Sequence, residues 1–524
     1  MISADRDCLG AADEVSRNPI ILMSSRGPIE FSTDEDGRLI QRRADGGVAT
    51  VLGAVANTTD TMWLAGARSK ADRIAAAAGD AITVGHGSRL RLIDCPQDIE
   101  DAHNEFCNTV LWFLQHDMLD RLDIEDFGAY ALQGWYNGYL PMNRAYAAAL
   151  ARETHDEVES VMIHDYHLYA APRFIRERFP NAFLQHFVHI PWPDCSKWDL
   201  LPGVLSASIV RGLLANDSIV FQTDDGVRNF LACVTRYVDG ALVDVEQGIV
   251  SLNGHETRAW ANPVSVKVED LEEAIESEEA MLAQQKLASK LGNQKTIVRV
   301  DRLDPSKNID RGFEAFARML DRHPEWRGRV RFLAFLVPTR GGIEAYKTHA
   351  REVFQQAKQI NCQYGNDDWQ PIDVFFQQNR TEALVALSMY DVLLVNSVAD
   401  GLNLVSKEGA IVNQRDGVLV LSKNVGAYQE LQGDALGIDP YDVDATAEAL
   451  HQGLAMSDTE RHIRAEGLRR AVREHEFQDW LDAILRDVPA QCCDHCGELT
   501  SAHIEPLSAI VVEEDFAAAI GGGS

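Results

Sequence analysis

Two cations stand five residues apart, Arg302 and Lys307, directly after the apolar run 296–300. Cations on a loop that leaves a strand can converge on one anion, and the arginine fork binds phosphate through two parallel hydrogen bonds. The pair can therefore bind a phosphate or diphosphate. For these residues taken alone, two solvated surface cations are the favoured interpretation.

A second segment, Asp400–Glu408 (DGLNLVSKE), follows the apolar run 392–395 and opens a helical pattern. Gly401 at a strand-to-helix turn lets backbone N–H groups approach a diphosphate at the helix N-terminus. The carboxylate of Glu408 can accept hydrogen bonds from ribose hydroxyls. Asp-Gly is also a common turn, and Glu408 can equally be an exposed helix residue.

Two polar residues in the first half of the chain follow apolar runs in the same way. Asp165 comes shortly after residues 161–163, and it either orients a sugar hydroxyl or caps the helix that follows. His189 lies near the end of the run 183–190, before a rigid Pro-Trp-Pro stretch. That position suits a ligand contact, although a core histidine with satisfied hydrogen bonds is the commoner outcome.

The elements that must position these residues are short apolar runs alternating with longer helical patterns, which is typical of parallel α/β units. The runs cover residues 19–23, 161–163, 183–190, 218–222, 296–300, 330–337, 372–376, 392–395 and 418–421. A Glu-, Ala- and Gln-rich stretch, 268–295, separates the two sets. Ligands of such sheets bind beyond the carboxyl ends of the strands. We therefore expect an α/β fold of two facing, doubly wound, Rossmann-like domains with the active site in the crevice between them.

Composition narrows the class of protein. The chain is 46% hydrophobic and 25% charged, which is ordinary for a globular protein. Its length of 524 residues is greater than a single hydrophobic core usually supports, so we expect two domains. The net charge of −31 argues against nucleic-acid and anionic-membrane partners, so an anionic substrate needs local cations. Residues 1–15 lack the pattern of an export signal. The nine cysteines are scattered except for Cys492, Cys493 and Cys496, and the scattered ones fit a reducing compartment, so we expect a cytoplasmic protein.

Four segments in this order resemble the trehalose-6-phosphate synthase family, retaining glycosyltransferases with two facing Rossmann-like domains in the GT-B arrangement. The segments are Ile163–Leu168, Val188–Pro191, Pro338–Gly341 and Asp400–Glu408. The resemblance runs from about Pro19 to about Val488. It implies transfer of glucose from a nucleotide-glucose donor, UDP-glucose or GDP-glucose, to a phosphorylated acceptor, foremost glucose 6-phosphate, which gives trehalose 6-phosphate.

The resemblance also implies roles for individual residues. The expected catalytic set is Arg302 and Lys307 on the leaving diphosphate, with Asp165 and His189 on the sugars. The expected donor-binding set is Gly46, Gly47, Asp400, Gly401, Leu402, Asn403, Leu404, Val405 and Glu408. The expected acceptor-binding set is Arg26, His103, Trp112, Asp165 and Arg340.

The chemistry implied by the resemblance needs neither a protein nucleophile nor a metal. The acceptor attacks from the face that the leaving group occupies, so configuration is retained, and a phosphate oxygen of the leaving group takes the acceptor proton. No Asp-X-Asp motif convincingly follows a strand, and Arg302 with Lys307 supplies the positive charge. We expect no cofactor; the partners are the two substrates, and a homo-oligomer is left open.

Several positions depart from the family pattern. His103 replaces a Tyr on the acceptor phosphate, Ser25 replaces an Asn, and residues 304–308 read Asp-Pro-Ser-Lys-Asn where Asp-Tyr-Ser/Thr-Lys-Gly is usual. The Asp-Pro-X-Lys-Asn and Asn396-Ser397 features look like the pseudoglycosyltransferase branch, which couples a nucleotide-cyclitol to an amino-cyclitol phosphate. A changed acceptor, such as glycerol 3-phosphate or a cyclitol phosphate, and a non-catalytic sugar-phosphate sensor therefore stay open.

The expected organisation has five parts: an N-terminal extension 1–18, an acceptor-binding domain 19–262, a nucleotide-sugar-binding domain 263–475, a returning helix 476–490 and a flexible tail 491–524. In the tail, Cys492, Cys493, His495, Cys496 and His503 are potential metal ligands. A single Cys-X-X-Cys is a weak signal for metal, and an oxidation-prone flexible tail is the favoured interpretation.

Overall fold

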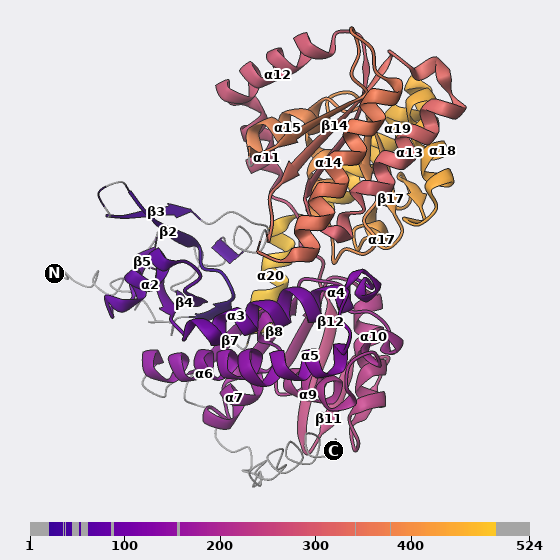
Figure 1. Ribbon diagram of the computed structural model, residues 1–524. Helices are drawn as coiled ribbons and strands as arrows, with labels where there is room; N and C mark the ends of the chain where they lie inside the picture. Colours follow the sequence, from indigo (N-terminus) through magenta and orange to yellow (C-terminus); the bar gives the residue numbers. More distant parts are fainter. Residues whose placement is uncertain are drawn as a thin grey trace, which may run out of the picture.

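The computed structural model describes residues 20–34, 36, 38–43, 52–53, 61–84, 88–154, 158–340, 342–377 and 379–488. These residues form two bodies, each built on its own sheet (Figure 1). The first body, indigo to magenta, lies below the second, which runs from rose to orange and yellow. The Gly46-Gly47 loop and the tail after residue 490 lie outside the described residues. None of the described helices combines the length and apolar composition needed to cross a bilayer.

The first body contains a ten-stranded sheet in the order β10-β11-β12-β9-β8-β7-β1-β4-β6-β5. Its centre, from β12 to β6, is parallel, and both ends are antiparallel. The strands are β1 (Ile20–Ser24), β4 (Thr61–Gly66), β5 (Ile82–Val84), β6 (Ser88–Ile93), β7 (Ser160–His164), β8 (Phe183–Val188), β9 (Ser218–Phe221), β10 (Leu242–Asp244), β11 (Ile249–Leu252) and β12 (His255–Ala261). A separate hairpin joins β2 (Ile29–Thr33) to β3 (Leu39–Arg43).

The second body contains a six-stranded sheet in the order β15-β14-β13-β16-β17-β18, with every pair parallel. Helices on both faces bury such a sheet, so its strands read as continuous apolar runs. The strands are β13 (Lys295–Arg302), β14 (Val330–Val337), β15 (Ile372–Phe376), β16 (Val392–Val395), β17 (Val418–Ser422) and β18 (Leu436–Ile438). The α/β fold with two doubly wound sheets predicted from the sequence is confirmed.

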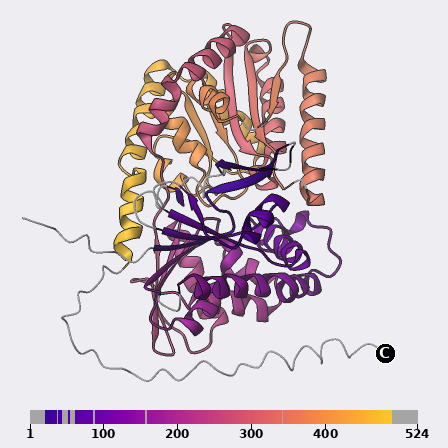
Figure 2. The same ribbon diagram turned by 90° about the vertical axis from the view of Figure 1, so that its left-hand side faces the viewer.

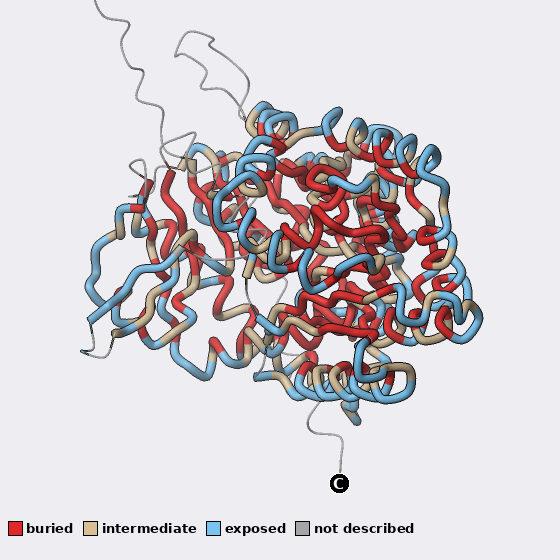
Figure 3. Tube along the Cα trace, turned by 90° about the horizontal axis from the view of Figure 1, so that it is seen from above, coloured by how far each residue is buried: buried red, intermediate tan, exposed pale blue. Residues whose placement is uncertain are grey.

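Helices surround both sheets. The first body has α2 (Lys70–Ala77), α3 (Gln97–Glu105), α4 (Trp112–Gln115), α5 (Phe127–Gly134), α6 (Leu140–Thr154), α7 (Ala171–Arg178), α8 (Cys195–Trp198), α9 (Gly203–Leu213) and α10 (Asp224–Tyr237). The remaining helices are α11 (Val268–Glu276), α12 (Glu278–Leu291), α13 (Ile309–Arg322), α14 (Glu344–Tyr364), α15 (Arg380–Ser388), α16 (Leu404–Val412), α17 (Tyr428–Leu431), α18 (Val443–Ala455), α19 (Asp458–Arg473) and α20 (Phe477–Asp487). Figure 3 shows buried chain concentrated along the strands and the inner sides of the helices.

Helix α20 follows the second body in sequence but packs on the first. Its Trp480 carbonyl accepts a hydrogen bond from Asn262 Nδ2 at 3.1 Å, and its Asp487 carboxylate accepts one from Gln185 Nε2 at 2.9 Å. Figure 2 shows the last helices, in yellow, running along one side from the upper body to the lower one. The chain thus crosses between the bodies twice, before α11 and before α20. The boundaries predicted at 262/263 and 475/476 stay predictions.

Two helical stretches of the first body widen into π-helical turns, η1 (Phe106–Leu111) and η3 (Trp135–Tyr139). Such turns occur often at functional sites. Helix α3 crosses η3 at close range, because a Cβ on Gly138 in η3 would lie only 2.2 Å from the backbone nitrogen of His103 in α3. Glycine is therefore required at position 138 for α3 to reach η3.

We expect Gly138→Ala to lower the free energy of unfolding by about 1–3 kcal/mol, because the added methyl group overpacks this crossing. Thermal unfolding followed by circular dichroism measures the change. Gly203→Ala is the matched control, since a Cβ at Gly203 meets no atom within 4 Å. A Gly138→Ala melting temperature equal to that of the wild type and of the control would contradict the packing argument.

Candidate active site

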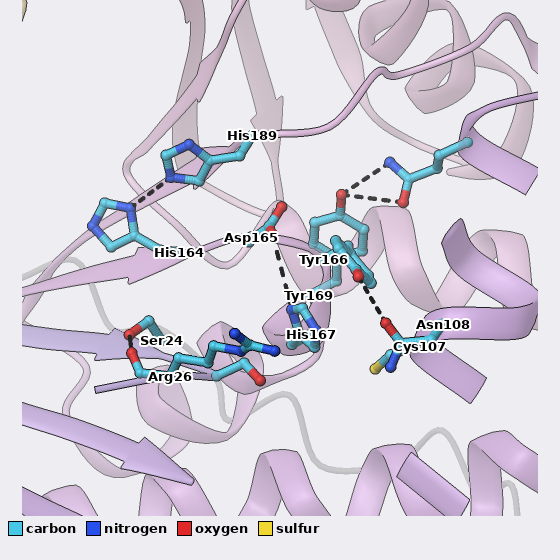
Figure 4. Close-up of polar contacts among 12 residues, drawn as sticks. Ser24, Arg26, Cys107, Asn108, His164, Asp165, Tyr166, His167, Tyr169 and His189 are labelled. Atoms are coloured by element: carbon cyan, nitrogen blue, oxygen red, sulfur yellow. Dashed lines mark hydrogen bonds and ion pairs between the residues drawn. The ribbon is translucent and has the colours of Figure 1, made fainter. Parts of the chain in front are cut away.

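The predicted site residues follow strand ends that face the crevice between the bodies. Asp165 comes directly after β7, His189 directly after β8, and Arg302 ends β13. Asp400 follows β16 and pairs through its backbone with Asn424 and Val425, next to β17. Figure 4 shows the first-body part of this site, with Asp165 and His189 at neighbouring strand ends and Arg26 extending below them.

Asp165 has a strained backbone and a perturbed carboxyl group. Its φ of 72° lies in the left-handed region, where non-glycine residues are rare and often functional. Its Oδ1 is buried without a hydrogen-bond partner in the described part of the chain, and its Oδ2 lies 3.9 Å from His167 Nδ1. Burial raises the pKa of Asp165 to about 7, against partial opposition from backbone N–H groups. This carboxyl group can exchange a proton near neutrality.

His189 is held by a second histidine. Its Nε2 lies 3.1 Å from His164 Nδ1, and the two rings stack with centroids 5.4 Å apart. Burial, followed by the nearby His186, lowers the pKa of His189 to about 3, so the ring is neutral at pH 7. A neutral imidazole fixed in this way can donate or accept one hydrogen bond to a sugar hydroxyl, and it adds no charge.

The two predicted leaving-group cations are both paired with carboxylates. Arg302 Nη2 lies 2.7 Å from Asp304 Oδ2, while the Arg302 side chain as a whole stays 55% exposed. Lys307, in the short 3₁₀ turn after β13, forms an ion pair with Asp400. Burial raises the pKa of Asp400, but Lys307 and the Asn403 amide outweigh it and hold that pKa below its usual value. Asp400 is therefore an anion that positions Lys307.

The turn after Asp400 brings the two bodies into contact. A Cβ on Gly401 would lie 2.0 Å from the carbonyl oxygen of His189, so only glycine fits there. Asn403 has a φ of 75° and caps α16 by accepting a hydrogen bond from the Ser406 N–H at 3.2 Å. The N–H groups of Leu404 and Val405 start the helix, where backbone donors lack intrahelical partners and attract anions. The segment predicted to hold the diphosphate thus has the backbone geometry for it.

Glu408 lies one turn further along α16 and is mostly buried. Burial raises its pKa, and Arg380 Nη2 lies 4.0 Å from its Oε1. Lys407 beside it is fully buried and points elsewhere, to Glu430 at 2.8 Å and to the Val264 carbonyl at 3.1 Å. Lys407 therefore ties α16 to the chain crossing between the bodies, which leaves Glu408 as the carboxylate available to a ligand.

Arg340 reaches from the second body into the first. Arg340 follows the end of β14, and its backbone has a φ of 38°. Its Nε donates to Asn108 Oδ1 at 2.8 Å and its Nη2 to the Tyr166 hydroxyl at 3.1 Å, both across the crevice. Its Nη1 lies 3.1 Å from Asp304 Oδ1, and its guanidinium carbon is 5.2 Å from the centre of the Trp112 ring. Arg340 and Trp112, predicted together from the resemblance, are in contact.

Asp304 joins the two predicted halves of the site. Its carboxylate is fully buried and lies between Arg302, a predicted donor residue, and Arg340, a predicted acceptor residue. Burial raises the pKa of Asp304, but Arg302 and Arg340 outweigh burial and lower it to about 2. Asp304, Asn108 and Tyr166 were not among the site residues predicted from the sequence. The sequence could have pointed to them only because they lie close in the chain to Arg302, Trp112 and Asp165.

Arg26 and His103 differ in their surroundings. The turn that carries Arg26 is fixed by Ser24, whose Oγ donates to the Arg26 carbonyl at 2.6 Å, and the Arg26 side chain is 51% exposed. His103 is buried, and its Nε2 lies 3.1 Å from the His167 carbonyl oxygen. Burial lowers the pKa of His103 to about 4, so it is neutral. The contact of His103 with the acceptor stays a prediction, and its Nε2 already contacts the His167 carbonyl oxygen.

Among the described residues, one group places three potential metal ligands close together. Ligand atoms of His323, Glu325 and His451 lie within 4.8 Å of one another. The two imidazole rings are stacked in parallel at 3.5 Å, and Trp326 Nε1 donates to His451 Nδ1 at 3.0 Å. One ion cannot lie in the planes of two parallel rings, so this arrangement suits stacking better than ligation. The prediction that the reaction needs no metal stays a prediction.

Comparison with known proteins decides the family. The sequence profile of Glycosyltransferase family 20 matches residues 18–490. This chain belongs to that family. The match covers both bodies and α20, so the family-20 residues include every described position discussed above.

The chain is also similar to individual proteins that are named trehalose-phosphate synthases. It is 27% identical over 477 residues to the UDP-forming α,α-trehalose-phosphate synthase of Candida albicans, covering 90% of this chain and 97% of that one. It is 32% identical over 430 residues to a bifunctional trehalose-6-phosphate synthase/phosphatase of Thermoproteus tenax, which covers 81% of this chain. The aligned region spans only 56% of the length of that bifunctional protein.

Solved structures show the same GT-B architecture as this family-20 chain. A UDP-forming α,α-trehalose-phosphate synthase of Burkholderia xenovorans in complex with glucose 6-phosphate gives a TM-score of 0.76 at 27% identity, covering 90% of this chain and 100% of that one. An E. coli structure described as trehalose-6-phosphate bound with UDP-2-fluoro glucose gives 0.77 at 26% identity, covering 90% and 99%.

We expect Asp304→Asn to lower the free energy of unfolding by about 3 kcal/mol at pH 7, because it removes the charge between two guanidinium groups. The folded pKa lies below the usual value of 3.8, so the stabilisation is present above that pH and fades as the pH falls toward 2. Urea unfolding at pH 7 and at pH 3, inside the range over which the stabilisation fades, measures it.

Asp373→Asn is the control for that variant, because Asp373 is also buried and pairs with Arg331 at 3.1 Å, on an edge strand of the same body. Both variants should lose stability, and only Asp304→Asn should weaken binding of UDP in calorimetry. Equal UDP affinity in the two variants would show that Asp304 has no part in the ligand site.

Proposed function

We propose that this chain transfers glucose from UDP-glucose to glucose 6-phosphate and forms trehalose 6-phosphate with retention of configuration. The observation that carries the proposal is Asp304, which binds the donor-side Arg302 and the acceptor-side Arg340 with the same carboxylate. Cations for two different anions therefore meet in one crevice. The choice of UDP as the nucleotide is supported by the UDP-forming relatives. The choice of glucose 6-phosphate as the acceptor is supported by the Burkholderia structure in complex with it.

The donor diphosphate is assigned to the second body. In this assignment Arg302 and Lys307 bind the diphosphate through their positive charges, and the backbone N–H groups at the N-terminus of α16 donate hydrogen bonds to it. When the bond from the anomeric carbon to the diphosphate oxygen breaks, negative charge grows on UDP and positive charge on the sugar. Preorganised cations on the leaving group stabilise this transition state more than the ground state. Glu408 is assigned to the ribose hydroxyls.

The acceptor is assigned to the space between Arg340, Arg26 and Asp165. Its phosphate takes the two guanidinium groups, and its reacting hydroxyl lies within reach of the donor sugar. The hydroxyl oxygen forms the new glycosidic bond, and its proton passes to a phosphate oxygen of the leaving UDP. Asp165 and His189 orient sugar hydroxyls by hydrogen bonds, and both are held by neighbouring strand ends.

We place the reaction in the cytoplasm and without a nucleic-acid or membrane partner, in line with the net charge of −31. No metal is assigned a role.

The direct test is nucleotide release from UDP-glucose and GDP-glucose by the full-length chain, with and without glucose 6-phosphate, followed by mass analysis of the products. We expect UDP release that depends on glucose 6-phosphate, formation of a disaccharide phosphate, and the same rate in EDTA. Donor binding without turnover would contradict the proposal and favour a sensor. Turnover only with glycerol 3-phosphate or cyclitol phosphates would assign a different acceptor.

Removing a leaving-group cation should slow the chemistry. We expect Arg302→Ala to lower kcat by about 10²–10³-fold, the usual cost of one preorganised group at a developing negative charge. Arg322→Ala, an exposed arginine that pairs with Asp444 on the outside of the same body, is the control. A kcat for Arg302→Ala within threefold of the control would remove Arg302 from the catalytic set.

The carboxyl group of Asp165 should appear in the pH profile. Because its pKa is raised to about 7, the ionised form is lost as the pH falls. We expect kcat/KM for glucose 6-phosphate to fall by up to about tenfold per pH unit below that pKa, since the ionised carboxylate is the stronger acceptor for a hydroxyl hydrogen bond. Initial rates from pH 5.5 to 9 measure it.

Asp165→Asn should lose that acid limb together with most of the activity. It should also be more stable than the wild type at pH 8, because burying the ionised carboxylate costs folding free energy above its unfolded pKa. The exposed Asp194, which caps α8, gives the control Asp194→Asn. An unchanged acid limb in Asp165→Asn would assign the titration to another group.

A further inference from the structure

Arg68 lies beside Arg26 and takes no part in the roles assigned above. The strands β1 and β4 are parallel neighbours, with Ser24 paired to Ala65. Arg26 follows Ser24 by two residues and Arg68 follows Ala65 by three, so both side chains leave the same edge of the sheet. This is the edge at which Asp165 and His189 lie.

The position of Arg68 is fixed by the residues around it. Its backbone N–H donates to Asp72 Oδ2 at 3.1 Å, and the same buried carboxylate accepts the N–H of Phe31 at 2.9 Å. Its Nη1 donates to Ser25 Oγ at 3.1 Å, next to Arg26. Asp72 thus holds the turn while the guanidinium extends toward the crevice. Of the five N–H donors of that guanidinium, one is bonded within the described part of the chain.

The charge around Arg68 is unbalanced. In the part of the chain that the structure describes, no carboxylate lies within 4 Å of its side-chain nitrogens, and Arg26 has the exposed Glu30 at 3.9 Å. Across the crevice, Arg302 and Arg340 share Asp304. The pKa of Arg26 is lowered first by burial and then by the charge of Arg68, followed by weaker effects of Arg302 and Arg340. Positive charges are therefore gathered with few counter-ions, in a chain of net charge −31.

We propose that Arg68 is a third guanidinium of the acceptor-phosphate subsite, with Arg26 and Arg340, and selects a dianionic phosphate monoester as the acceptor. The inference rests on the proposed function and deepens it. The planar arginine fork matches a phosphate through paired hydrogen bonds. Arg68 belongs to the first body, beside Arg26, whereas the diphosphate cations Arg302 and Lys307 belong to the second. The phosphate of the acceptor is thus the anion nearest to Arg68.

The test compares Arg68→Met and Arg68→Gln with the wild type and with Lys70→Met, which removes an exposed cation two residues away. We expect KM for glucose 6-phosphate to rise about 10- to 100-fold in both Arg68 variants, the loss of one hydrogen bond to a charged group. KM for UDP-glucose and kcat should stay within threefold, and Lys70→Met should match the wild type.

A role for Arg68 in folding alone would change both substrates together, so parallel rises in the two KM values would overturn the inference. An unchanged KM for glucose 6-phosphate in Arg68→Gln would overturn it as well. The glutamine can still bond Ser25, so this variant serves if Arg68→Met fails to fold.

Failure of the proposed function itself is seen in the wild type, as absence of UDP release with glucose 6-phosphate. In that case calorimetry with inorganic phosphate tests Arg68 alone. Binding at least tenfold weaker in Arg68→Gln than in Lys70→Met supports the anion subsite. Equal binding in the two variants, or no phosphate binding by the wild type, overturns it.

Discussion

The arrangement of the crevice depends on one buried carboxylate between two guanidinium groups. Burial of a lone charge costs several kcal/mol, so Asp304 can stay ionised only because Arg302 and Arg340 both reach it. Arg302 is the last residue of β13 and Arg340 follows β14, and these two strands are paired with Arg302 opposite Val337. The sheet register therefore places them side by side, and Asp304 holds both in position. Arg340 then extends over Trp112 to Asn108 and Tyr166 of the first body, so the same interaction also sets how the two bodies meet.

The fold was predictable to the extent that its strands are buried on both faces. All nine apolar runs are strands, because parallel strands such as β9 and β16 bury every residue. Among the missed strands, β2 is exposed or half-buried throughout, and β12 alternates exposed with buried residues. The apolar residues of these two strands are interrupted by polar ones, so a search for runs does not find them. Strand β4 was missed although its first five residues are buried.

The site was predictable as a set of residue types, and less so as a set of contacts. Arg302, Lys307 and Asp400 follow strands, and strand ends could be recognised. The charge state of Asp165 could not, because it comes from burial that only the assembled fold creates. The sharing of Asp304 by Arg302 and Arg340 also depends on the register of β13 and β14, and on the positive φ of Arg340. The resemblance predicts His103 as an acceptor residue, but it gives no sign of the His167 carbonyl that contacts the ring, because His167 lies in a distant segment.

The return of α20 to the first body has a consequence for biosynthesis. The first sheet is complete in sequence at Ala261, yet Gln185 and Phe187 at its centre contact Trp480 and Asp487. At ribosomal rates of about 5–20 residues per second, those partners emerge roughly 10–45 s after the sheet has been made. During that interval the nascent sheet exposes an apolar face around Phe187. The first body can therefore reach its final packing only after translation has passed the second body.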